Sequence, residues 1–88
     1  MEFSQLKNKF CDIDETKESP EVIVVYLKGT SLTRPKIFEI FEKGEIIEET
    51  ALGSMKIMDN ADMETMFLFL TRVREIWEAR NDVRKFKK

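Results

Sequence analysis

The chain has 88 residues, of which 36% are charged and 42% hydrophobic, and its formal net charge is −2 at pH 7. This length predicts one domain, residues 1–88, with a modest core and a small margin of stability. The sequence has no histidine and one cysteine, Cys11, which excludes histidine-based acid–base catalysis, an internal disulfide and the usual cysteine zinc sites.

The composition also bears on the compartment. No basic segment followed by an apolar run lies near Met1, so no signal peptide is expected. The apolar run Met66–Leu70 is far too short to cross a bilayer. A single thiol suits a reducing setting, so we expect a cytoplasmic protein that makes no membrane contact.

The first predicted element is a short helix from about Ser4 to Cys11, because apolar residues recur there at helical spacing. Ser4 is its expected cap, and an edge strand is the alternative. Residues 12–18 then form an acidic loop that ends before Pro20. The spacing of its carboxylates does not match a calcium loop, so no metal site is predicted, although cation binding by this loop stays open.

The best predicted strand runs from Val22 to Leu27, because it is dense in β-branched residues. Its continuous apolar character predicts burial on both faces and a central place in the sheet. Gly29 should end this strand in a turn. A Gly-Thr-Ser turn is able to bind phosphate through its backbone, but the sequence lacks the Walker pattern, so a plain turn is favoured.

Residues 36–42 are ambiguous between helix and strand. As a strand, they would form a hairpin with residues 45–50 that sets Glu39 opposite Glu48, an unfavourable pairing of like charges. As a helix, they would have Thr33 as the N-cap and Gly44 just past the end. The helix is favoured, and the hairpin is the alternative.

Two short strands are predicted at residues 45–50 and 54–58, joined by a turn at residues 51–53. A long helix follows from Ala61 to Lys88, with no glycine or proline and with Asp59 and Asn60 as its expected cap. Its apolar stripe ends after Trp77, so residues 79–88 are expected to project from the core.

These elements predict an α+β fold, in which a small two-layer domain has a short, mostly antiparallel sheet covered by the long C-terminal amphipathic helix. The expected core members come from the long helix, from two of the predicted strands and from residues 36–42: Trp77, Phe67, Leu70, Val24, Ile23, Phe41 and Ile57.

The long helix is more apolar than one sheet requires. Its apolar face spans roughly twice the ~100° that an ordinary surface helix needs. Methionine and aromatic residues suit adaptable contact surfaces. We therefore expect a non-catalytic protein–protein interaction module, a small regulator or inhibitor that acts through this helix as a homodimer or docked on a larger protein. The residues in surplus are Met66, Phe69, Ile76 and, on the polar side, Leu68.

The alternative is a nucleic-acid-binding protein that uses the basic helix end. The residues concerned are Arg80, Arg84, Lys85, Lys87 and Lys88. The acidic overall charge and the interspersed carboxylates count against this reading.

An enzyme is not expected. The candidate groups are Cys11, Asp12, Asp14 and Glu15, and the sequence offers no histidine to activate the thiol. The carboxylates lie in a hydrophilic loop rather than in a cleft that would raise a pKa. No catalytic residue, cofactor or metal site is predicted.

Overall fold

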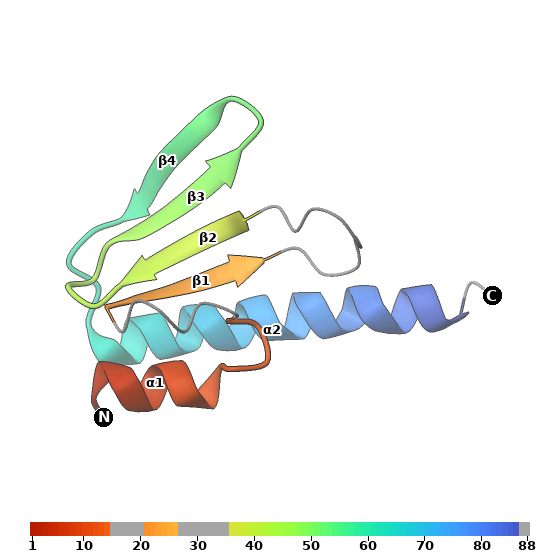
Figure 1. Cartoon of the computed structure of the whole chain (residues 1–88), viewed down its shortest axis with the longest axis horizontal. Coiled ribbons are helices and arrows are strands. Elements are labelled where there is room, and N and C mark those ends of the chain that lie inside the picture. The colour runs from red at the N-terminus through yellow and green to blue at the C-terminus, as the bar shows by residue number, and fades with distance from the viewer. Residues whose placement is uncertain (15–20, 27–35, 87–88) are drawn as a thin grey trace.

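A computed structural model describes residues 1–14, 21–26 and 36–86, with the side chains of the last helix described as far as Glu78. The elements are α1 (Phe3–Lys9), β1 (Val22–Tyr26), β2 (Lys36–Phe41), β3 (Ile46–Thr50), β4 (Gly53–Met58) and α2 (Met63–Phe86). The strands form one antiparallel sheet in the order β1-β2-β3-β4, and the two helices share a core with it (Figure 1). This confirms the predicted two-layer α+β fold.

The core lies where one cross-strand row of the sheet meets both helices. Paired residues of an antiparallel sheet point to the same face, so a row runs across all four strands. The first three members of this row are fully buried, and the fourth is partly buried. The row consists of Ile23, Ile40, Ile46 and Met58. Opposite it lie Leu6 of α1, Phe10 just after α1, and Met66 and Leu70 of α2, all 0–1% exposed.

A second cross-strand row shows that the sheet diverges from the helices toward β4. Val25, Phe38, Glu48 and Met55 are paired in turn across the four strands. Exposure rises along this row, from 0% at Val25 to 57% at Met55. Figure 1 shows the cause, since the β3–β4 hairpin diverges from α2 while β1 lies beside it. The outer hairpin is therefore thinly covered on its helix side.

The favoured helix at residues 36–42 is wrong, because this segment is strand β2. It forms the alternative hairpin with β3, but with a three-residue loop rather than the expected two. Phe41 donates its N–H to the carbonyl of Glu45, and Gly44 donates to that of Phe41. The longer loop shifts the register by one residue, so Glu39 lies opposite Ile47 and not opposite Glu48. The like-charge penalty that disfavoured the hairpin is thus absent.

The prediction of two further strands is confirmed as β3 and β4, which Ala51 and Leu52 connect. Ile46 pairs with Met58 on the core face of the sheet. Ile57, a predicted core residue, is instead 39% exposed, because a register shift between Ile46 and Ile47 leaves it out of the ladder. Lys56 lies on the opposite face, and its hydrogen bond to Glu45 raises the pKa of the Lys56 amine.

Strand β1 is buried on both faces, as predicted, with Val22 to Val25 at 9% exposure or less. Its expected central place is wrong, because β1 is an edge of the sheet. The continuous apolar run thus predicted that both faces of β1 are covered, but it did not predict where β1 lies in the sheet. The predicted turn at Gly29 lies outside the described residues.

Both helices begin at other caps than those predicted. Asp62, not Asp59 or Asn60, caps α2, accepting the N–H of Thr65 at 2.8 Å on its Oδ1 atom. The α1 cap is Glu2 instead of Ser4. In the part of the chain that the structure describes, neither helix has the length and apolarity needed to span a membrane.

Candidate functional site

The inner face of α2 is committed to the core. Met66, which was predicted as an interaction residue, is 1% exposed and contacts the sheet and α1 as part of the core cluster. Phe69, a second predicted member, packs edge-on against Phe38 of β2, with ring centroids 5.1 Å apart at 89°. Packing inside the chain therefore accounts for Met66 and for most of Phe69.

The other two predicted residues lie on the solvent side. Leu68 is 60% exposed and Ile76 is 58% exposed, although both are large aliphatic side chains. Arg72 lies between them at four-residue steps and is exposed as well, so the three form one row along the helix. We call Leu68, Arg72 and Ile76 the α2 outer flank. In the sequence, Val83 continues this side of the helix, but its side chain lies outside the described part.

The flank of α2 that faces α1 is closed by Arg74. Its Nε donates to Asp12 Oδ2 at 2.9 Å, and its Nη2 donates to Asp12 Oδ1 at 2.6 Å and to the carbonyl of Lys9. The guanidinium also stacks 4.3 Å from the centroid of the Phe10 ring. Sequence reasoning missed this contact, because helical spacing carries no signal for a partner so distant in sequence.

The acidic segment after α1 is used by the fold. Asp14 is 8% exposed and accepts the N–H of Val24 at 3.2 Å, while its second oxygen lies 3.5 Å from Lys7 Nζ. Asp12 pairs with Arg74. Glu15 and Glu18 lie outside the described residues. Within the described ranges, no group of three or more histidine, cysteine or acidic residues is arranged to hold a metal ion.

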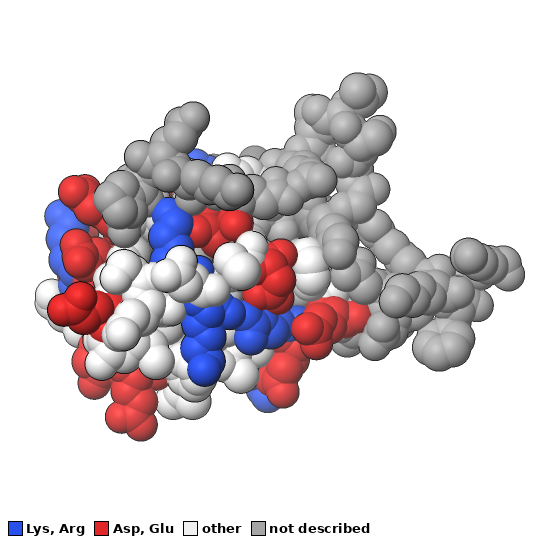
Figure 2. Space-filling view, turned by 60° about the horizontal axis from the view of Figure 1, so that its bottom comes forward, with Lys and Arg blue, Asp and Glu red and all other residues white. Residues whose placement is uncertain are grey.

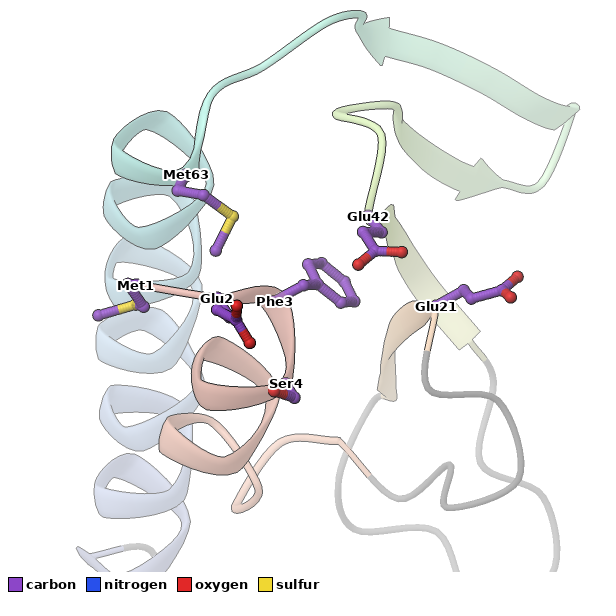
Figure 3. Close-up of a pocket in the computed structure, with 7 residues that line it drawn as sticks. All are labelled: Met1, Glu2, Phe3, Ser4, Glu21, Glu42 and Met63. Carbon is purple, nitrogen blue, oxygen red and sulfur yellow. The ribbon is translucent and has the colours of Figure 1, made fainter.

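A hollow of about 530 Å³ opens beside the start of α1. Figure 3 shows the Phe3 ring pointing into it, with Glu42 and Glu21 on the strand side and Glu2 on the helix side. The remaining lining residues are Met1, Ser4 and Met63. Its ionisable side chains are the carboxylates of Glu2, Glu21 and Glu42, and Ser4 adds a hydroxyl group.

A second hollow, of about 350 Å³, lies between the two helices and is lined by Met1, Lys9, Met63, Glu64 and Phe67. Lys9 Nζ sits 5.4 Å from the centroid of the Phe67 ring, so the hollow is floored by an aromatic ring and a cation that already contact each other. The thiol of Cys11, which follows α1 in the chain, is exposed and forms no disulfide.

The described charges on one face of the molecule are of both signs. On the face that carries α1, acidic and basic side chains alternate around uncharged areas (Figure 2). The basic residues proposed for nucleic-acid contact, Arg80, Arg84, Lys85, Lys87 and Lys88, have side chains outside the described residues. Within the described residues, the exposed part of the predicted interaction site is therefore the α2 outer flank.

No protein family, no curated protein and no solved structure matches this chain in sequence or fold.

Proposed function

We propose that the protein is a non-catalytic protein–protein interaction module whose contact surface is the α2 outer flank. The observation that carries this proposal is the exposure of Leu68 and Ile76, at 60% and 58%, on a helix whose opposite face already fills the core. An isolated exposed aliphatic residue needs no explanation, but two on one row of a helix form a ridge. Burying such a ridge in a partner is favourable by about 25 cal/mol per Å² of apolar surface.

The flank suits a protein partner in its composition. Leu68 and Ile76 provide apolar anchors two helical turns apart, and Arg72 between them adds a group that is common in interface hot spots. The module acts as a small regulator or inhibitor, either by self-association through this flank or by docking it on a larger protein.

Sedimentation equilibrium over a wide concentration range, at low and high salt, tests the self-associating form. A dimer held by the α2 outer flank persists in high salt and is lost in Leu68→Glu and in Ile76→Glu. Leu52→Glu is the matched control, because Leu52 is a fully exposed leucine on the β3–β4 turn, away from the helix. Dissociation by Leu52→Glu, with Leu68→Glu behaving as the wild type, would place the contact on the hairpin and contradict the flank.

A wild-type monomer at all concentrations leaves docking on a larger protein, which a photo-reactive residue at position 72 tests in cells that produce the protein. A cross-linked product of defined mass that Ile76→Glu removes is the expected result. Absence of any such product, together with a monomeric wild type, would contradict the proposal.

A further inference from the structure

The two edges of the sheet differ in how their backbones are satisfied. At the β1 edge, Lys7 Nζ donates to the carbonyl of Val22 at 2.8 Å, and the N–H of Val24 donates to Asp14 Oδ1 at 3.2 Å. Asp14 also forms an isolated antiparallel bridge with Val25. Side chains and backbone from α1 and the turn after it therefore close this edge against another strand.

The β4 edge has no such closure among the described residues. β4 pairs with β3 on one side and with no described segment on the other. Five of its six residues are exposed, among them Met55 at 57% and Ile57 at 39%. Its one charged residue, Lys56, is engaged within the chain, at 2.9 Å from Glu45 and 3.6 Å from Asp59. β4 thus offers a row of backbone groups with little charge to repel a second strand.

We propose that β4 is a self-pairing edge, at which the β4 strand of a second copy adds in antiparallel orientation and joins the two sheets into one. The proposal concerns a different surface from the α2 outer flank and does not depend on the proposed function. Backbone hydrogen bonds supply the attraction, as in other cases of strand addition. A two-fold axis makes the contact closed, with the same residues contributed by each copy.

Symmetry restricts the register of this pairing. Directly opposed residues of an antiparallel pair point to the same face of the sheet, and a two-fold axis perpendicular to the sheet keeps every residue on its own face. Because neighbouring residues alternate between the faces, the axis must place one residue opposite its own copy. An axis at Lys56 would oppose two lysines, and an axis at Ser54 would leave only a short overlap. An axis at Met55 pairs Met55 with its copy and sets Ser54 opposite Lys56, a small residue opposite a long one.

The hydrogen-bonding pattern agrees with an axis at Met55. Thr50 and Gly53 flank the two-residue turn, so alternation along the antiparallel ladder directs the backbone of Gly53 and Met55 toward β3 and that of Ser54 and Lys56 outward. Ser54 of one copy and Lys56 of the other then exchange about four backbone hydrogen bonds over the two symmetric pairs. The irregularity at Ile57 lies beyond these central pairs.

The occupant is a second β4 rather than a β1 strand. Pairing β4 with β1 of another copy would be heterologous and would propagate into an open chain of molecules. The closure of the β1 edge by Lys7 and Asp14 blocks that arrangement. A pairing of this small size is weak, with a Kd on the order of 0.1 mM.

The test is sedimentation velocity up to millimolar concentration on the wild type, Ser54→Pro and Ser54→Ala. Proline at position 54 removes the outward N–H without removing a bond to β3, and alanine removes only the exposed hydroxyl contact with Glu49. The wild type and Ser54→Ala should dimerise, and Ser54→Pro should weaken dimerisation at least tenfold. A monomeric wild type, or equal dimerisation of all three proteins, would overturn the proposal. Leu68→Glu should leave this dimer intact, which distinguishes it from association through α2.

A distance measurement keeps the proposal falsifiable if Ser54→Pro does not fold. A spin label at Leu52→Cys, in a Cys11→Ser background, lies three residues from the axis in each copy. At about 3.4 Å per residue, the two labelled backbones are then separated by about 20 Å. A principal electron–electron distance far from this value at millimolar protein would contradict the β4 pairing.

Discussion

Replacing Gly44 by alanine should destabilise the protein more than the same change at Gly53. Both glycines have positive φ at a hairpin, +100° at Gly44 in the β2–β3 loop and +125° at Gly53, the first residue of β4. An alanine in such a conformation is strained by about 1–3 kcal/mol, partly offset by a gain of ~0.4–1 kcal/mol from the stiffer unfolded chain. Backbone strain is therefore common to the two sites.

The two sites differ in what the added methyl group meets. At Gly53 nothing lies within 4 Å, whereas at Gly44 the new Cβ would overlap the backbone N and O of Ala61 and lie 2.8 Å from the carbonyl carbon of Asn60. Backbone atoms cannot rotate away as a side chain does, so overpacking adds about 1–3 kcal/mol. The Gly44 carbonyl also accepts the N–H of Ala61 at 2.9 Å, and this bond joins the β2–β3 loop to the start of α2.

We expect a net loss of about 1–2 kcal/mol for Gly53→Ala and about 2–5 kcal/mol for Gly44→Ala, from a total that is on the order of 4–13 kcal/mol for this length. Urea unfolding followed by circular dichroism and by Trp77 fluorescence measures both variants at constant slope. Losses that agree within about 0.5 kcal/mol would refute the contact between Gly44 and the segment before α2.

Three further predictions concern ionic contacts. Arg74→Ala should lower the free energy of unfolding by about 1–2 kcal/mol because it releases α1 from α2. The control Arg72→Ala changes an exposed arginine on the same helix and should alter the free energy of unfolding by under ~0.5 kcal/mol. Equal effects of the two variants in urea unfolding would argue against the contact of Arg74 with Asp12 and Lys9. Asp14→Ala should cost about 2–4 kcal/mol, because it removes the acceptor of the Val24 N–H and the carboxylate that pairs with the partly buried Lys7. A near-neutral result in the same assay would contradict that role. Hydrogen bonds from Thr65 hold the pKa of Asp62 below its ordinary value of 3.8, so the cap stabilises the fold fully above that value and is lost as the pH falls through the lowered pKa. Asp62→Ala should therefore flatten the acid limb of the stability profile, and an unchanged limb would exclude the cap as its source.

The fold was largely predictable from the sequence, because α1 and α2 carry apolar residues at helical spacing and β1 is dense in β-branched residues. The strand at residues 36–41 was not predictable in this way. The choice between helix and strand depended on the length of the following loop, which the spacing of apolar residues does not reveal. A three-residue loop places Glu39 opposite Ile47 and removes the charge conflict that favoured a helix. The position of Gly44 was recognised, but it serves a hairpin turn rather than a helix end.

The candidate site was predictable in part, for a different reason. The width of the apolar face identified α2 correctly as more apolar than a surface helix, but a helical wheel does not show where neighbouring elements lie. α1 covers one flank through Arg74, and Phe38 of β2 covers Phe69 on the other. What remains exposed, Leu68 and Ile76, follows from these tertiary contacts and not from the wheel.

The most direct test of the proposed contact surface is site-specific photo-cross-linking in cells that produce the protein, with the reactive side chain at position 72 and, as a control, at Asn8 on the exposed side of α1. The account predicts a discrete protein adduct, to a second copy or to a larger protein, from position 72 and not from position 8. Adducts of equal yield from both positions, or from position 8 alone, would contradict the assignment of the α2 outer flank as the interaction surface.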